Sequence, residues 1–227
     1  MWQRYKYHVL MHVIIFLWGF TGILGKLIHK DFLHIVWYRV LIACIALGIF
    51  LLLSSKSLSV SRKDLPKIIG VGMIVALHWM SFYWAIQLST ASLAILCLST
   101  TTLHVTWLEP LIMKRKFSWR EFVMGLLVIV GIAFVAKDFT MKENYALLIG
   151  LFSALCAAFF SVFNGKLSQK IAAEHLTFYE LLTGFIFTSF VLLSISRFSR
   201  DADGFTSPMF ALKIIWLLEF WMYFRVS

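Results

Sequence analysis

The chain has 227 residues, of which 61% are hydrophobic and only 14% are charged, and its mean hydropathy is +0.86. This composition lies far outside the range of soluble globular proteins and predicts an integral membrane protein. The net charge of +10 does not indicate nucleic-acid binding, because the Lys and Arg residues lie in short gaps between apolar runs, where loops face anionic lipid.

The apolar runs predict transmembrane helices. A helix needs about 20 mostly apolar residues to cross a bilayer, and helices satisfy their own backbone hydrogen bonds in lipid. Seven runs meet this requirement, namely 9–28, 35–53, 68–86, 91–113, 122–136, 146–163 and 176–195. An eighth, 209–224, is short and carries Lys213 and Glu219. The predicted fold class is an all-α polytopic membrane protein with seven to eight transmembrane helices.

The basic residues are distributed unequally between alternate loops. Twelve Lys and Arg lie on the side of the amino terminus, and six lie on the other side. The first group is Arg4, Lys6, Lys56, Arg62, Lys63, Lys67, Lys114, Arg115, Lys116, Arg120, Lys166 and Lys170; the second is Lys26, Lys30, Lys137, Lys142, Arg197 and Arg200. Because positive loops stay in the cytoplasm, we expect a multi-pass protein of the cell membrane, inner or plasma, with a cytoplasmic amino terminus.

A charged hexad occurs twice in the chain. "GKLIHK" at 25–30 is matched by "GKLSQK" at 165–170, and "HIVWYR" at 34–39 is matched by "HLTFYE" at 175–180. The first hexad closes the first helix and the second closes the sixth, so the duplicated unit has five helices. A unit with an odd number of helices ends on the opposite side of the membrane from where it begins, so its second copy is inverted relative to the first. Inverted repeats are typical of secondary transporters. We expect residues 1–140 to form the first repeat and residues 141–227 to form an incomplete second repeat.

Three segments together resemble the EamA-like family of the drug/metabolite transporter superfamily. They are "FLWGFTGILGK", "YWAIQLSTASLAIL" and "LEPLIMKRKFSWREFVMGLLVIVGIAFV". The resemblance covers residues 9–196 and implies ten helices in two five-helix repeats, of which this chain would carry helices one to eight. It also implies transport, commonly export, of a small metabolite such as an amino acid, a nucleoside or a sugar.

The length of the second repeat departs from this pattern. Only 32 residues follow Ile195, where a family member would carry about three more helices. We therefore expect a truncated transporter. A short relative that closes its core by forming a homodimer is the alternative.

Polar and aromatic residues inside the apolar runs are candidates for a substrate pathway, because they are costly in hydrocarbon unless they face a cavity or a partner. The candidates are Trp18, Arg39, His78, Trp79, Tyr83, Thr100, His104 and Glu180. Arg39 and Glu180 occupy equivalent repeat positions, and each either lines a pathway or reaches back to its own interface. Lys26 and Lys166 end their helices, and we expect both to anchor at the headgroups.

Two of the apolar runs contain candidate residues for the walls of the substrate pathway. His78 lies near the bilayer midplane, and Trp79 and Tyr83 follow it; together they suit a ring-bearing or cationic substrate. The alternative is a histidine that forms hydrogen bonds between packed helices. Thr100 and His104 share a helix face with Trp107, with ordinary interhelical hydrogen bonding as the alternative.

Other classes of function have weaker support. An enzyme would need a nucleophile with a base or a metal cluster, and His8 and His12 lack a third ligand nearby. We therefore expect no catalytic residue, no metal and no cofactor, and as partners the lipid bilayer and a small-molecule metabolite but no nucleic acid. The main hypothesis is a secondary transporter that works by alternating access. The alternatives are a truncated protein that does not transport and a structural or receptor-like membrane protein.

Overall fold

The computed structural model describes residues 2–54, 59–136 and 140–196, and all elements in these ranges are helices, as predicted. They are α1 (Trp2–Leu27), α2 (Phe32–Leu53), α3 (Leu65–Leu88), α4 (Ala91–Leu98), α5 (Thr101–Met113), α6 (Trp119–Val135), α7 (Met141–Leu167) and α8 (Ala173–Ser196). The predicted run 209–224 lies outside the described residues.

Six segments of the described chain are long and apolar enough to cross a membrane. They lie in α1, α2, α3, α7 and α8, and in the stretch Ala91–Met113 that contains α4 and α5. The remaining predicted run, 122–136, falls in α6, which has 17 residues. At 1.5 Å per residue this helix is about 26 Å long, slightly less than the ~30 Å of a bilayer core.

The predicted helix 91–113 is interrupted in the structure, which corrects the prediction of one continuous helix. α4 ends at Leu98 and α5 begins at Thr101. The hydroxyl of Ser99 donates to the carbonyl oxygen of Leu96 at 2.5 Å, and that of Thr100 donates to the carbonyl of Cys97 at 2.7 Å. Such side-chain bonds compete with the regular helical ladder, and they explain why the helix breaks here.

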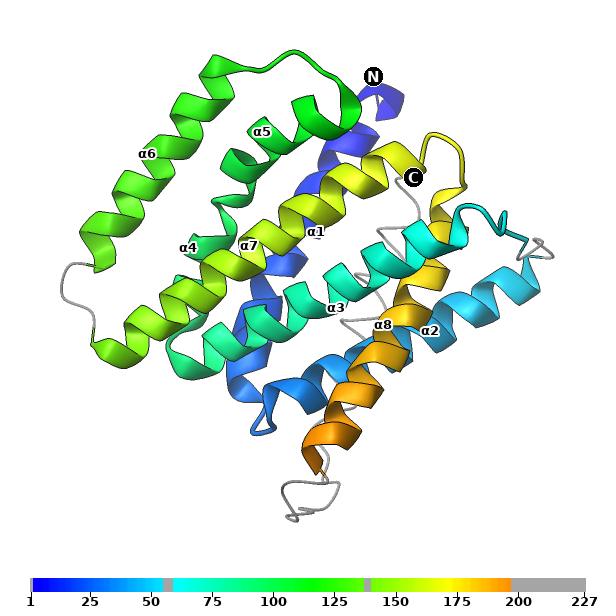
Figure 1. Cartoon of the computed structure of the whole chain (residues 1–227), viewed down its shortest axis with the longest axis horizontal. Helices are drawn as coiled ribbons and strands as arrows, with labels where there is room; N and C mark the ends of the chain where they lie inside the picture. Colours follow the sequence, from blue (N-terminus) through cyan, green and yellow to red (C-terminus); the bar gives the residue numbers. More distant parts are fainter. Residues whose placement is uncertain (1, 55–58, 137–139, 197–227) are drawn as a thin grey trace.

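α3 lies at the centre of the bundle, with α7 and α8 packed against it and α2 beside α8 (Figure 1). Small residues allow the closest approaches. A Cβ atom at Gly72 of α3 would lie 2.8 Å from the carbonyl oxygen of Glu180 in α8. One at Gly150 of α7 would lie 2.8 Å from the sulfur of Cys97 in α4. Close backbone contact of this kind is how helices gain packing energy in lipid, where the hydrophobic effect does not drive them together.

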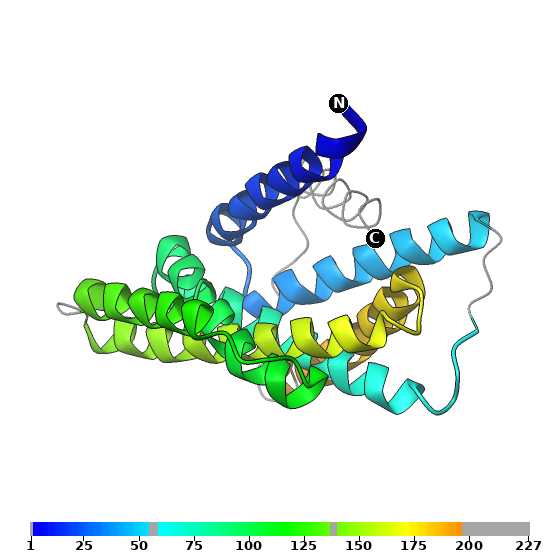
Figure 2. The same cartoon turned by 90° about the horizontal axis from the view of Figure 1, so that it is seen from above.

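α1 stands away from the layer formed by the other helices (Figure 2). In its carboxyl-terminal half, Gly22 faces Ile95 of α4 and Gly25 faces Tyr83 of α3. An open apolar groove of about 420 Å³ runs along the amino-terminal half. It is lined by Tyr5, His8, Val9, His12, Val13 and Phe16, all from α1 itself. Because a single helix forms its walls and none of the polar side chains between helices contributes, we do not place the functional site there.

Candidate functional site

The predicted residues Arg39, Trp79 and Tyr83 lie together at the contact between α2 and α3. Nη1 of Arg39 donates to the hydroxyl of Tyr83 at 3.0 Å. The guanidinium carbon lies 4.5 Å from the centre of the Trp79 ring, which is cation–π geometry. Tyr83 is fully buried and Arg39 is partly buried. The aromatic side chains of α3 therefore hold the cation of α2 in a fixed position between two membrane-length helices.

The depth of this cluster bears on the alternatives for Arg39. Trp79 lies nine residues before the end of α3 at Leu88, which corresponds to about 13 Å along the helix. Arg39 lies seven residues after the start of α2, or about 10 Å from that helix end. The guanidinium thus lies against a ring that is at least as far from its own helix end as Arg39 is.

His78 joins α3 to α7 through Ser153. Its Nδ1 lies 3.0 Å from the carbonyl oxygen and 2.9 Å from the hydroxyl oxygen of Ser153. That hydroxyl in turn donates to the carbonyl oxygen of His78 at 2.9 Å. Ser153 is buried, and the ring of Phe82 stacks on the imidazole with centroids 6.1 Å apart. This geometry corresponds to the alternative of a histidine held by hydrogen bonds between packed helices.

Glu180 lies inside the contact of α8 with α7 and α3. The residue is 4% exposed, so other parts of the protein cover it. Nδ2 of Asn164 in α7 donates to its Oε2 at 3.1 Å. The other carboxyl oxygen, Oε1, and the amide oxygen of Asn164 are both buried and have no hydrogen-bond partner among the described residues. Arg39 and Glu180, the last residues of the matched segments 34–39 and 175–180, thus both contact a neighbouring helix, one as a cation and the other as a buried acid.

The other predicted residues are dispersed. Thr100 is completely buried at the break and is bonded to its own helix, whereas Trp107 is 36% exposed. The structure therefore does not bring Thr100 to the surface that carries Trp107. His104 is partly buried beside Trp107, with ring centroids 6.4 Å apart. Trp18 lies in α1, and its side chain is not among those that the structure describes.

The two lysines of the repeated hexad cap neighbouring helices, which differs from the expected anchoring at headgroups. Nζ of Lys26 donates to the carbonyl oxygen of Ser89 at 2.7 Å and to that of Ile86 at 3.3 Å, at the end of α3. Nζ of Lys166 donates to the carbonyl of Ile112 at 3.0 Å, at the end of α5. Both cations satisfy carbonyl groups that have no partner within their own helix and oppose the negative end of its dipole.

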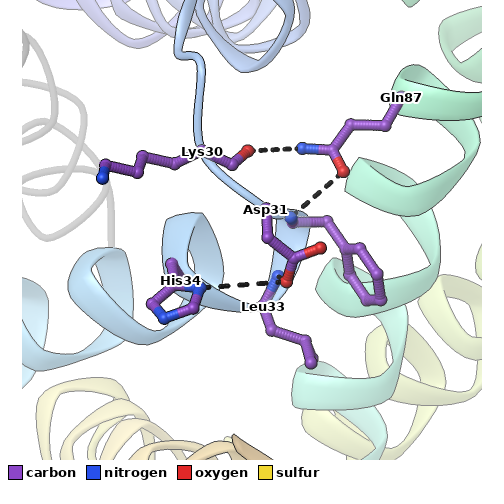
Figure 3. Close-up of polar contacts among 6 residues, drawn as sticks. Lys30, Asp31, Leu33, His34 and Gln87 are labelled. Carbon is purple, nitrogen blue, oxygen red and sulfur yellow. Dashed lines mark hydrogen bonds and ion pairs between the residues drawn. The ribbon is translucent and has the colours of Figure 1, made fainter. Parts of the chain in front are cut away.

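A second contact fastens the turn between α1 and α2 to the end of α3 (Figure 3). The side chain of Gln87 donates to the carbonyl oxygen of Lys30 at 2.7 Å and accepts from the backbone N–H of Phe32 at 3.1 Å. Asp31 caps α2 by accepting from the N–H of Leu33 at 3.1 Å. Because one amide group satisfies both a carbonyl and an N–H of the turn, it fixes the position of α2 along α3.

Reasoning from the sequence missed the partners Ser153, Asn164 and Gln87. Asn164 does break the apolar pattern near the end of α7, a signal that was compatible with a simple helix cap. Ser153 belongs to a small-residue stripe whose spacing indicates packing. Nothing in the local pattern predicts which distant residue each of them contacts.

Comparison with known proteins gives one match. A family model described as the EamA-like transporter family matches residues 6–137, more than half of the chain. The matched stretch includes Arg39, His78 and Tyr83, whereas Asn164 and Glu180 lie beyond it. No curated protein and no solved structure matches the chain.

Proposed function

This chain belongs to the EamA-like transporter family, and we propose that it is a secondary transporter that exports a small metabolite across the cell membrane by alternating access. Family membership confirms the resemblance seen in the sequence and makes the protein a membrane transporter of small molecules. The coupling, the direction and the residues that contact substrate belong to the proposal.

The observation that carries the proposal is the position of Arg39. A charged side chain inside the hydrocarbon is costly unless it faces a partner or a water-filled cavity. Arg39 meets this need in part through Trp79 and Tyr83 of α3. A guanidinium presents several N–H donors in a planar fork that suits a carboxylate or a phosphate. We therefore place the anionic group of the substrate at Arg39, with an apolar or ring-bearing part against the aromatic side chains of α3.

The break between α4 and α5 supports the proposal that part of the bundle moves during transport. Discontinuous helices in transporters allow one segment to shift while the other stays packed. Here α4 contacts α7 at Gly150, and the hydroxyl of Thr101 at the start of α5 donates to the carbonyl oxygen of Ala154 in α7 at 3.4 Å. The two halves are thus attached to the same helix on either side of the break, so rotation about residues 99–100 would change how the bundle closes on α7.

The experiment is transport by the full chain in sealed vesicles, measured with a panel of carboxylate-bearing and neutral metabolites. Arg39→Gln keeps a polar side chain of similar reach but removes the charge, and we expect it to lower flux on the order of tenfold or more. Arg120→Gln is the matched control, because Arg120 is exposed in the first turn of α6. Equal flux in the Arg39 variant and the control, at equal amounts of folded protein, would contradict a role for Arg39 in the pathway.

A further inference from the structure

The contact between the carboxyl of Glu180 and the amide of Asn164 has more hydrogen-bond acceptors than donors. Nδ2 of Asn164 already donates to Oε2 of Glu180. Oε1 of Glu180 and Oδ1 of Asn164 remain, and within the part of the chain that the structure describes both are buried acceptors without a hydrogen-bond partner. Buried acceptors are almost always paired, so two unpaired oxygens in one contact need an explanation. A proton on the carboxyl, or a cation or a water molecule between the two oxygens, would each satisfy them.

A proton fits the pair better than a metal ion. Protonation converts Oε1 from an acceptor to a donor, and a carboxylic acid facing an amide has the donors and acceptors for two parallel hydrogen bonds. In that arrangement the amide N–H donates to Oε2 and the acid O–H donates to Oδ1. A hard metal cation takes about six oxygen ligands, and this pair offers only two unpaired ones.

The surroundings of Glu180 contain no compensating charge among the described residues. Asn164 is the hydrogen-bond partner of its carboxyl, and no charged side chain of α2, α3 or α7 interacts with it. Four charged or titratable groups of those helices have contacts elsewhere: Arg39 with Tyr83, Lys67 with Asp64, His78 with Ser153 and Lys166 with Ile112. On α8 itself, Nε2 of His175 is buried and has no hydrogen-bond partner among the described residues.

We propose that the Glu180–Asn164 pair is a proton-binding site whose loading and release couple transport to the proton gradient. This step rests on the proposed function. The carboxylate takes one proton from water on the open side, forming the O–H bond of the acid, and later returns that proton to water on the opposite side; no other bond changes. The protonated pair holds α7 against α8 in a dry contact. Loss of the proton leaves a charge there, which draws in water and opens the contact.

The first test observes the site without substrate. Infrared spectra of the purified full chain, taken across a pH series, should contain the C=O stretching band of a protonated carboxyl that persists to neutral pH. We expect Glu180→Gln to remove this band and Asn164→Ala to shift it. Glu174→Gln, which removes another carboxyl of the same helix, should retain it. Absence of any band that depends on Glu180 would overturn the proposal. So would loss of the band on adding Na⁺ at constant pH, because a metal ion would then occupy the pair.

The second test addresses coupling. Flux in vesicles should respond to an imposed pH gradient, and Glu180→Gln should abolish that response while Glu174→Gln preserves it. If His175→Gln abolishes the response and Glu180→Gln does not, the proton belongs to the histidine and the proposal is wrong. If the infrared band is present but flux ignores the gradient, the pair binds a proton without coupling it. Failure of transport in all proteins would instead contradict the proposed function, since the infrared result does not depend on it.

Discussion

Gly25 of α1 leaves the space that the ring of Tyr83 in α3 occupies. A Cβ atom at position 25 would lie 2.6 Å from Cε1 and 2.8 Å from Cδ1 of that ring. Tyr83 is fully buried, and its hydroxyl accepts the hydrogen bond from Arg39. The absence of a side chain in α1 thus determines where α3 holds the cation of α2.

Replacing Gly25 by Ala should therefore disturb the candidate site. The tyrosine ring must move, which we expect to cost about 1–3 kcal/mol of stability and to lower flux by displacing Arg39. Gly165→Ala is a matched control, because Gly165 holds the same place in the second hexad and its Cβ would meet Sδ of Met113 at 3.8 Å, an ordinary contact. Thermal unfolding and flux would be measured for both. A Gly25 variant as stable and active as the Gly165 variant would contradict this account.

Replacing His78 by Ala should reduce folded protein and flux together. His78 and Ser153 tie α3 to α7, and removing the imidazole leaves the buried hydroxyl of Ser153 with one partner fewer. We expect a loss on the order of 1–3 kcal/mol. His104→Ala should cost less, because His104 is only partly buried at the edge of α5. Quantifying folded protein in the membrane beside flux would show whether the two fall in proportion. A loss of flux without a matching loss of folded protein would indicate that His78 lines the pathway.

Replacing Gln87 by Leu should loosen the turn between α1 and α2. The change leaves the carbonyl of Lys30 and the N–H of Phe32 without their partner, at about 1–3 kcal/mol for each group that stays buried. Gln169→Leu, at an exposed position between α7 and α8, serves as the control for added hydrophobicity. Hydrogen exchange at the start of α2 should rise in the Gln87 variant only. Unchanged exchange would mean that the turn holds its position without the amide.

The topology predicted from the basic residues needs a test in the membrane. A reporter fused after Lys116 should lie in the cytoplasm, and one inserted beside Ser89 should lie outside. Lys116 follows α5 and Ser89 follows α3, so the two sites lie at the ends of helices that cross in opposite directions. If both reporters lie on the same side, the two repeats are not inverted relative to each other, and this prediction is wrong.

Hydropathy alone predicted the helices. Every span must be about as long as the bilayer core is thick, and in lipid it must satisfy its backbone hydrogen bonds internally. It failed at the break between α4 and α5, where apolar neighbours masked the hydroxyl run from Ser99 to Thr102. The signal was present, since each of these side chains can bond a carbonyl of the preceding turn. The run 122–136 was predicted as a span, and the helix there, α6, begins three residues earlier and has 17 residues.

The candidate site was only half predictable. Arg39, Trp79 and Tyr83 were identified as polar or aromatic residues within apolar runs, and the structure brings all three together. The pairing of Glu180 with Asn164 was not predictable, because it depends on how the turn between α7 and α8 folds one helix back on the other. Lys26 and Lys166 were expected to face lipid headgroups, since sequence gives no sign that a neighbouring helix ends within reach.

Alternating access is the central claim, and counterflow tests it most directly. Vesicles that contain the full chain are loaded with an unlabelled metabolite that it transports, and uptake of the labelled metabolite is then followed from outside. A carrier that exposes one site to each side in turn must exchange the two, so we predict that internal substrate accelerates uptake and produces a transient accumulation above the final level. Uptake that is equal to that of protein-free vesicles, or that is indifferent to internal substrate, would contradict the account.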